Sequence, residues 1–212
     1  YLDDSGLAYL FVSDIDNNSE DACGILNSSL SQDEFDCSHL GENTITLTIE
    51  DENGNSSTCT ATVSVIDDIL PTVVCTNISV YLDNDGEVTI TSADMDGGSY
   101  DNCTLVSLSA SQTTFICDEV GTQVVTLTGE DNSGNINNCE STLTVIDSVA
   151  PKAYCNDFTI QLDSDGLGIL TTSDVDDNSS DNCGIGSLAL TQTDFDCSHV
   201  GSNTVTMTVT DI

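Results

Sequence analysis

The stretch "TITLTIEDENGNSSTCTATVSVID", residues 44–67, has the pattern of two β-strands joined by a turn. Apolar side chains alternate with threonine in residues 44–50 and with other polar residues in 59–65, so each segment has one face suited to burial. The Asp, Asn and Gly residues between them, at 51–55, are typical of a turn. The stretch therefore predicts an antiparallel hairpin.

This hairpin belongs to a unit that recurs every 80 residues. "TVTMTVT" at 204–210 repeats its first strand, and the acid-rich string "SDVDDNSSDNCG" at 173–184 has counterparts that begin at Ser13 and Ala93. A fixed spacing without slippage is typical of tandem copies of one small domain. We define a first copy (1–70, start missing), a second copy (71–150, complete) and a third copy (151–212, end missing), and expect the chain to be a slice of a longer array.

Short alternating segments fill the rest of each copy. "ISVYL" at 78–82 and "EVTIT" at 87–91 flank the turn "DNDG" at 83–86, and residues 104–117 predict one or two more strands. No segment has a helical period of useful length. Six or seven short strands per copy, separated by turns, predict an all-β fold of tandem immunoglobulin-like antiparallel β-sandwich domains.

One series of residues carries a family resemblance. "GTQVVTLTGEDNSGN" from Gly121 is followed by Cys139, by "LTVID" ending at Asp147, and by Pro151 and Cys155. This series resembles the hyalin-repeat (HYR) domain, especially the acidic HYR-like repeats of Bacteroidota surface adhesins, and the likeness covers essentially the whole chain. It implies an immunoglobulin-like sandwich in a secreted, multi-domain bacterial surface protein, with no single ligand. The chain departs from the family in having four cysteines per repeat, where HYR domains have two.

The charge of the chain excludes two classes of partner. With 37 acidic residues, a single basic residue and a formal net charge of −36, the chain repels nucleic acid and anionic membranes. Strong acidity often accompanies disorder. Here, however, the hydrophobic residues amount to 38% and alternate cleanly, which indicates folded strands.

The cysteines indicate disulfides rather than a metal site. A repeat of 80 residues without tryptophan has a small core that needs covalent support. The chain has ten cysteines and two histidines, and none of its cysteines forms a CxxC pair. This composition predicts disulfides, and with them an oxidising, extracellular setting.

The strand order predicts one disulfide, and the others follow by assignment. The first and last strands of a tandem sandwich start at the same end and can run parallel, which places Cys75 beside Cys139, the pair that the HYR resemblance also implies. The remaining cysteines are paired within each copy as Cys23 with Cys37, Cys103 with Cys117, and Cys183 with Cys197. Cys59 and Cys155 are left without partners in this slice, because Cys59 and Cys75 should lie about a domain length apart.

Acidic loops are expected to meet at the N-terminal end of each copy, together with the linker from the preceding copy. Oxygen ligands of this kind suit Ca²⁺. The predicted ligands are Asp14, Asp16 and Asp51 in the first copy, Asp67, Asp94, Asp96 and Asp131 at the first junction, Asp147, Asp174, Asp176 and Asp211 at the second junction, and Asp83 and Asp85 in the "DNDG" turn. The alternative is that these residues are abundant only because Asp and Asn favour exposed turns.

Catalysis is not expected. His39 and His199 are equivalent positions, but the second copy has Glu119 there, and no nucleophile or phosphate-loop motif is present. We expect the disulfide-linked, calcium-stiffened shaft of an extracellular filament or cell-surface adhesin, whose partners are neighbouring repeats and identical chains in a fibre. The alternative is an array of carbohydrate-binding or protein-binding modules, appended to a secreted enzyme.

Overall fold

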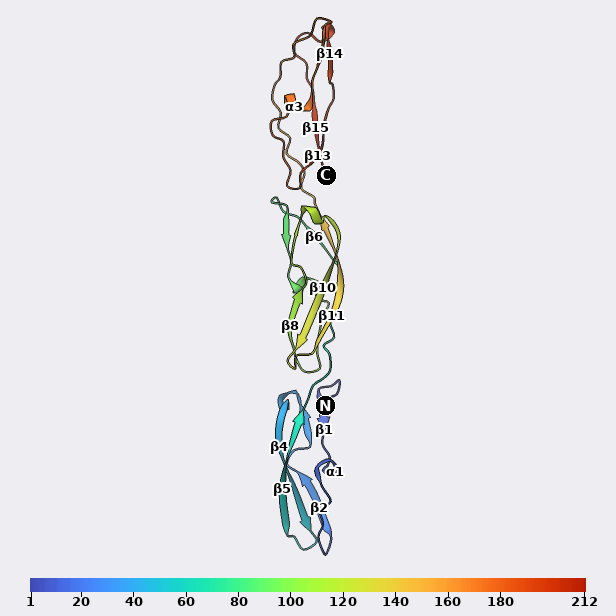
Figure 1. The fold of residues 1–212 in the computed structure, drawn as a ribbon, viewed down its shortest axis with the longest axis vertical. Coiled ribbons are helices and arrows are strands. Elements are labelled where there is room, and N and C mark those ends of the chain that lie inside the picture. Colours follow the sequence, from blue (N-terminus) through green and yellow to red (C-terminus); the bar gives the residue numbers. More distant parts are fainter. The chain divides into compact units, whose positions relative to one another are not determined.

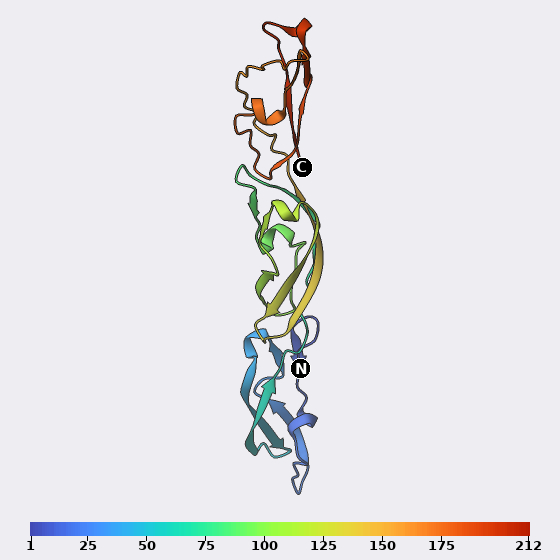
Figure 2. The same ribbon diagram turned by 45° about the horizontal axis from the view of Figure 1, so that its top comes forward.

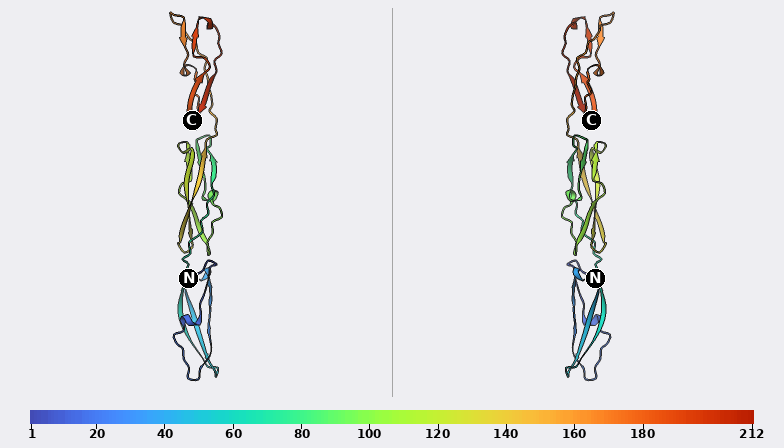
Figure 3. Two further views of the ribbon diagram at one scale, coloured as in Figure 1. Left: turned by 90° about the vertical axis from the view of Figure 1, so that its right-hand side faces the viewer. Right: turned by 90° about the vertical axis from the view of Figure 1, so that its left-hand side faces the viewer.

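A long antiparallel hairpin forms the centre of the first copy in the computed structural model, which describes residues 1–212. Strands β4 (Gly41–Asp51) and β5 (Ser56–Val65) pair over ten residues, and they run side by side in Figures 1 and 3. Gly54 in the turn has a φ of +83°, a conformation that glycine adopts without strain. Ile45 and Leu47 are each only 1% exposed. The hairpin predicted from residues 44–67 is confirmed.

The three copies contain thirteen further strands. The first copy has β1 (Leu7–Tyr9), β2 (Ile25–Leu30) and β3 (Glu34–Asp36); the second has β6 (Ile78–Tyr81), β7 (Glu87–Thr89), β8 (Leu105–Ala110), β9 (Thr114–Ile116), β10 (Gly121–Asp131) and β11 (Ile136–Ile146); the third has β12 (Leu167–Ile169), β13 (Ile185–Leu190), β14 (Asp194–Asp196) and β15 (Met207–Asp211). Equivalent strands keep the spacing of the sequence repeat; β2, β8 and β13, for example, begin at residues 25, 105 and 185.

Helical structure is limited to single turns. The four-residue helices α1 (Val12–Ile15), α2 (Ser92–Met95) and α3 (Thr172–Val175) lie at the starts of the acid-rich strings. Figure 2 shows α3 as a short helical ribbon. The 3₁₀ turns η1 (Cys37–His39), η2 (Cys117–Glu119) and η3 (Cys197–His199) directly follow strands β3, β9 and β14. No helix is long and apolar enough to span a membrane.

Strand pairing gives each copy more than one sheet. The orders are β2-β4-β5 and β1-β3 in the first copy, β6-β11-β10-β8 and β7-β9 in the second, and β13-β15 and β12-β14 in the third. The pairs are antiparallel except for β11 with β6, which is parallel. The all-β, immunoglobulin-like antiparallel sandwich predicted from the sequence is therefore confirmed.

The chain forms two compact units, and both take part of the second copy. Unit 1 comprises Tyr1–Thr76, Ser92–Ser111 and Thr126–Ser141, and unit 2 comprises Asn77–Thr91, Gln112–Val125 and Thr142–Ile212. The first junction, which joins the first copy to the second, lies in unit 1, and the second junction lies in unit 2. The copy boundaries drawn at Pro71 and Ala150 stay a prediction.

One phenylalanine per copy lies in the core. Phe35 is 2% exposed, Phe115 is fully buried and Phe195 is 7% exposed. In unit 1, Phe35 forms a buried cluster with Leu2, Ile45 and Val65. Alternation along the long strands thus supplies the core, as the pattern of residues 44–67 predicts.

The disulfide predicted between the first and last strands is present. Cys75 and Cys139 are bonded, with a Cα–Cα distance of 5.9 Å. The parallel pairing of β6 with β11 explains this contact. Cys75 comes shortly before Ile78, and Cys139 comes shortly before Leu143, the partner of Ile78, so both cysteines lie at the same end of the paired strands. Cys59 and Cys155 are free and exposed.

The other predicted disulfides, Cys23–Cys37, Cys103–Cys117 and Cys183–Cys197, are wrong. Cys37 is bonded to Cys103, and Cys117 to Cys183, so these two bonds join consecutive copies. Cys23 and Cys197 are free and exposed.

The strand arrangement explains the error. In the first copy β2 separates Cys23 from Cys37, and β2 pairs with β4 rather than with the following β3, so the chain does not fold back on itself. Six extended residues span about 20 Å, far beyond the ~7 Å that a disulfide allows between Cα atoms. Cys37 and Cys117 instead bond to a cysteine of the following copy.

Glycine is required where a hairpin turn approaches a disulfide between copies. Gly86 has a φ of +77°, and a Cβ there would lie 2.6 Å from the Cys117 Sγ and 3.0 Å from the Asn182 carbonyl oxygen. Gly134 has a similar φ of +86°, but a Cβ there would meet no atom within 4 Å.

These two glycines give a matched test. We expect Gly134→Ala to lower the free energy of unfolding by about 1–2 kcal/mol, because an L-residue is strained in the left-handed region. Gly86→Ala should lower it clearly further and reduce the yield of the Cys117–Cys183 bond. Chemical denaturation and peptide mapping without reduction measure the two effects; equal losses in both variants would show that the close approach is not important.

Candidate cation centres at the copy junctions

Three carboxylates converge at the first junction. Asp67 follows β5 in the first copy, Asp101 lies in the loop after α2, and Asp131 ends β10 of the second copy. One carboxylate oxygen from each lies within 4.8 Å of the other two. Asp67 and Asp131 are only 5% and 3% exposed. The junction thus collects negative charge from two copies in a largely buried place.

Asp131 is held by the turn that it begins. Its Oδ1 accepts hydrogen bonds from the backbone N–H groups of Ser133 and Asn135, both at 2.8 Å, and its Oδ2 accepts from the Asn135 side chain at 2.8 Å. The Asn135 amide also donates to the Asp67 carbonyl oxygen at 3.2 Å. The turn between β10 and β11 therefore fixes one carboxylate and contacts the linker that carries another.

Asp67 and Asn102 connect the two copies. The Asn102 side chain donates to Asp67 Oδ1 at 3.2 Å and to the Asp3 carbonyl oxygen at 3.3 Å. The Ser133 hydroxyl donates to Asp67 Oδ2 at 3.3 Å. With the bond from Asn135 to its carbonyl oxygen, Asp67 of the first copy is thus held by three residues of the second.

Two buried oxygens at this junction have no hydrogen-bond partner. Asp101 Oδ2 accepts from the N–H groups of Cys103 and Thr104, at 2.9 and 3.1 Å, but Asp101 Oδ1 accepts from none. Asn102 Oδ1 is also buried and without a partner. Leaving such an acceptor unsatisfied costs about 1–3 kcal/mol, and more when it is charged. The two oxygens therefore need a positively charged or hydrogen-donating group.

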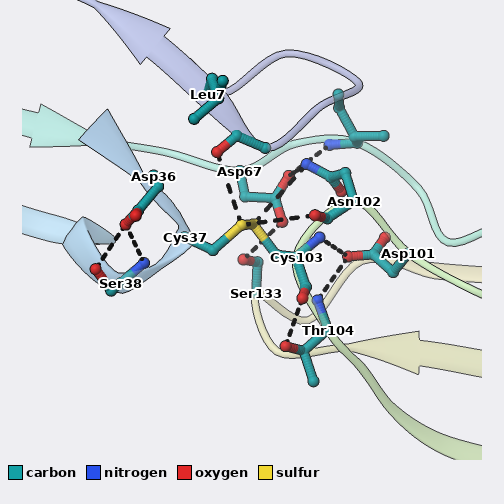
Figure 4. Close-up of a disulfide and its surroundings, with 12 residues drawn as sticks. Leu7, Asp36, Cys37, Ser38, Asp67, Asp101, Asn102, Cys103, Thr104 and Ser133 are labelled. Atoms are coloured by element: carbon teal, nitrogen blue, oxygen red, sulfur yellow. Dashed lines mark hydrogen bonds between the residues drawn. A yellow bond between two sulfur atoms is a disulfide. The ribbon is translucent and has the colours of Figure 1, made fainter. Parts of the chain in front are cut away.

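The disulfide between copies lies directly beside these oxygens (Figure 4). Cys103 follows Asn102 in sequence, and its partner Cys37 has its Sγ 3.7 Å from the Asn102 carbonyl oxygen. A Cβ on Gly6 would lie 2.9 Å from both the Cys37 Sγ and that carbonyl oxygen. The bond and the close glycine hold the loop of Asp101 and Asn102 against the first copy.

The second junction has the same arrangement 80 residues later. Asp147, Asp181 and Asp211 also have carboxylate oxygens within 4.8 Å of one another, and all three are half-buried. Asn182 donates to Asp147 Oδ1 at 3.3 Å and to the Asp83 carbonyl oxygen at 3.0 Å. Asp181 Oδ1 and Asn182 Oδ1 are again buried without partners. The arrangement is therefore a repeated feature of the chain.

Charge repulsion at each junction is substantial. Two unit charges 5 Å apart repel by about 3 kcal/mol at an effective dielectric constant of 20. The only Lys or Arg of the chain is Lys152, so unit 1 has neither of these residues. Three carboxylates and a free amide oxygen form a set of hard oxygen ligands, which suits a divalent cation such as Ca²⁺.

Four of the predicted ligands take part in these clusters: Asp67, Asp131, Asp147 and Asp211. The other nine predicted ligands do not. Asp14, Asp16, Asp51, Asp94, Asp96, Asp174, Asp176, Asp83 and Asp85 are absent from both clusters.

Most of these other aspartates stabilise local turns instead. Asp14 and Asp174 accept hydrogen bonds from backbone N–H groups at the starts of α1 and α3, and Asp16 and Asp176 accept from serines three residues later. Asp83 accepts from the N–H groups of Asp85 and Glu87 in the "DNDG" turn. The turn-forming role that the sequence left open as an alternative accounts for their positions.

The ligands predicted from the sequence did not include Asp101, Asn102, Asp181 and Asn182. Each Asp-Asn pair directly precedes a cysteine, and both pairs keep the 80-residue spacing. The signal was present in "DNCT" at 101–104 and "DNCG" at 181–184. It could be used only with the knowledge that the following cysteine bonds to the preceding copy.

Hydrogen bonds lower the pKa of several turn aspartates. The side-chain hydroxyl and then the N–H of Ser19 lower the pKa of Asp16 below its ordinary value of 3.8. Ser99 has the same effect on the pKa of Asp96, and Asn55 on that of Asp51. These carboxylates are stabilised as anions by their own turns.

Comparisons with known proteins give no family. No protein-family model matches the chain, and no curated protein matches it. Extracellular cadherin domains 1–4 of protocadherin gamma B7 are 15% identical, with a TM-score of 0.33, over 89% of this chain and 59% of that chain. The protocadherin GammaB4 extracellular domain is 17% identical, with a TM-score of 0.35, over 78% of this chain and 34% of that chain. The chain thus spans less than two thirds of these structures.

The Asp16 turn gives a prediction about pKa. Ser19→Ala should raise the pKa of Asp16 towards 3.8, because it removes the largest cause of the lowering. Since the folded pKa is depressed, the hydrogen bond stabilises the fold above the unfolded pKa, and this contribution is lost as the pH falls through the folded pKa. Carbon-detected NMR titration of the carboxyl group measures it, with Ser13→Ala as control. An unchanged pKa in Ser19→Ala would contradict the assignment.

Proposed function

We propose that this chain is part of the shaft of an extracellular adhesin or filament, in which consecutive immunoglobulin-like copies are joined by a disulfide and by a calcium ion. The role is structural rather than enzymatic. The observation that carries the proposal is the convergence of Asp67, Asp101 and Asp131 from two copies around buried oxygens that have no partner. A cation bound there contacts both copies and resists their separation.

The ligand chemistry supports calcium over magnesium. Ca²⁺ accepts six to eight oxygens in a flexible geometry, whereas Mg²⁺ requires a tighter octahedron and retains several waters. At the first junction the carboxylates of Asp67, Asp101 and Asp131 and the amide oxygen of Asn102 would hold the ion, and Asp147, Asp181, Asp211 and Asn182 would hold it at the second. Water and backbone carbonyl oxygens would complete the shell.

The disulfides support an extracellular location. Three disulfides in one chain are typical of proteins from oxidising compartments. The Cys37–Cys103 bond closes a separation of 66 residues, and by the chain-entropy model a loop of this size contributes about 4 kcal/mol. Such bonds between copies suit a protein that bears mechanical load outside the cell.

The resemblance to acidic HYR-like repeats supports the adhesive part of the proposal. In this view each copy is a spacer that extends a surface adhesin of a bacterium, and its first partners are the neighbouring copies of its own chain. Identical chains would associate laterally into a fibre only with cations between them, because the net charge of each is −36.

Thermal unfolding tests the calcium part. With free Ca²⁺ about 100-fold above the Kd, each ion adds about 2.7 kcal/mol to the free energy of unfolding, so a chelator should lower the Tm of the oxidised chain. Asp101→Asn should lose part of this response. Asp118→Asn removes one charge from an exposed side chain with no hydrogen bond and serves as the control. A Tm that does not change with the chelator would contradict the proposal.

The Cys37–Cys103 disulfide should also hold the loop of Asp101 and Asn102 in place before a cation binds. We expect Cys37→Ser with Cys103→Ser to weaken calcium binding at the first junction by about tenfold or more, because the loop of Asp101 and Asn102 is then ordered only on binding. Isothermal titration calorimetry should still find the second junction at its original affinity. The pair Cys75→Ser with Cys139→Ser is the control. Equal weakening by both pairs would indicate a general loss of stability instead.

A further inference from the structure

Strand β1 and the two residues after it have one buried face and one exposed face. Ala8 and Leu10 pack against the buried cluster of the first copy. Successive residues of an extended segment point to opposite sides, and Phe11 still has extended φ and ψ angles of −104° and 152°. Leu7, Tyr9 and Phe11 therefore point outward, where Tyr9 is 58% exposed and Phe11 is 66% exposed. We call these three residues the aromatic face.

Carboxylates lie next to both aromatic residues. Strand β3 is antiparallel to β1, and Glu34 is the residue directly opposite Tyr9. Residues opposite one another in such a pair have Cβ atoms about 4.5–5.5 Å apart on the same side of the sheet. Asp14 accepts a hydrogen bond from the Phe11 N–H at 2.8 Å with its Oδ2. Glu34 and Asp14 are both exposed, so an approaching ligand meets a carboxylate beside each aromatic residue.

The outer side of this strand faces solvent in the second copy as well. There β7 pairs only with β9, and the equivalent residues Thr89 and Thr91 are exposed although the copy contains six strands. The third copy has Ile169 and Thr171 at these positions. The pair of aromatic residues is thus particular to the first copy, and the fold does not require it.

The charges around the aromatic face indicate the chemistry of its partner. The chain has 37 acidic residues, and its one basic residue, Lys152, lies in the third copy, so an anionic ligand is repelled. A neutral apolar partner would cover Glu34 and Asp14 without pairing them, which is costly. A cation is attracted both by a carboxylate and by the face of an aromatic ring. The arginine side chain suits both groups, because its planar guanidinium stacks on a ring and forms forked hydrogen bonds with a carboxylate.

We infer that the aromatic face is a docking surface for an arginine-rich segment of another protein. The segment is extended and has arginine at alternate positions, which recur at about 6.7 Å, the interval between Tyr9 and Phe11 along their own backbone. One guanidinium stacks on each ring, and Glu34 and Asp14 accept its hydrogen bonds. The inference concerns the target of adhesion and does not rest on the calcium sites.

A pair of peptides separates this surface from general attraction by charge. The probe is a fluorescent peptide in which arginine alternates with serine, and the reference is the same peptide with lysine in place of arginine. Both are titrated with the oxidised chain in anisotropy measurements at fixed salt and calcium concentrations. A net charge of −36 attracts both peptides equally. We expect the arginine peptide to bind at least about fivefold more tightly, because only guanidinium both stacks and forms forked hydrogen bonds.

The aromatic residues can be tested against a matched tyrosine. Tyr9→Ser with Phe11→Ser should weaken binding of the arginine peptide by about fivefold or more and remove its advantage over the lysine peptide. Tyr81→Ser is the control, because Tyr81 is 59% exposed but lies opposite Ile146 rather than a carboxylate. This variant should bind both peptides as the unaltered chain does.

The carboxylate can be tested at constant net charge. Glu34→Gln and Glu52→Gln each remove one negative charge from an exposed side chain, but only Glu34 lies beside Tyr9, so only Glu34→Gln should weaken binding severalfold. Equal affinity for the two peptides would overturn the inference, as would equal losses in the two glutamine variants. The same holds if the Tyr9 and Phe11 variant binds as tightly as Tyr81→Ser. A neutral glucan oligosaccharide that displaces the peptide would assign the surface to a carbohydrate instead.

Discussion

The repulsion among carboxylates at the junctions is the constraint around which the rest of the structure is arranged. Asp67, Asp101 and Asp131 come from two copies and from three segments distant in sequence, yet their oxygens lie within 4.8 Å of one another. Two of them are almost fully buried, and no Lys or Arg lies in unit 1. A fold that holds like charges together in this way must oppose their repulsion with other contacts or with a bound cation.

Covalent and polar contacts both oppose the repulsion among the carboxylates. The Cys37–Cys103 bond attaches the second copy to the first, while the Asn102 amide donates across the junction to Asp67 and to the Asp3 carbonyl oxygen. The turn that contains Gly6 can come this close to the disulfide and to the Asn102 carbonyl oxygen only because Gly6 has no side chain. The Cys75–Cys139 bond has a different role, since it joins the first and last strands of a single copy.

Strand pattern made much of the fold predictable. Alternation in residues 44–67 was sufficient for the hairpin of β4 and β5, and the parallel relation of the first and last strands was sufficient for Cys75 and Cys139. The pairing of Cys103 was not predictable in the same way. It depends on how the loop of one copy contacts the preceding copy, and the sequence pattern within a copy does not indicate that contact.

The candidate cation site was also only partly predictable from the sequence. Asp67 and Asp131 were predictable, because the linker and the hairpin turn must reach the same end of a sandwich. Asp94 and Asp96 were expected there as well, but the charged string begins with the helical turn α2, and Asp96 accepts hydrogen bonds within that string from Ser99. Asp101 takes their place because Cys103, two residues later, is fixed to the first copy.

The most direct test of the account is the stoichiometry of calcium binding to the oxidised chain, measured by isothermal titration calorimetry. We expect two ions per chain for the unaltered protein, one for Asp101→Asn or Asp181→Asn, and none at these sites for the double variant. Two ions in the double variant, or no binding in the unaltered chain, would contradict the claim that the junction carboxylates form cation centres.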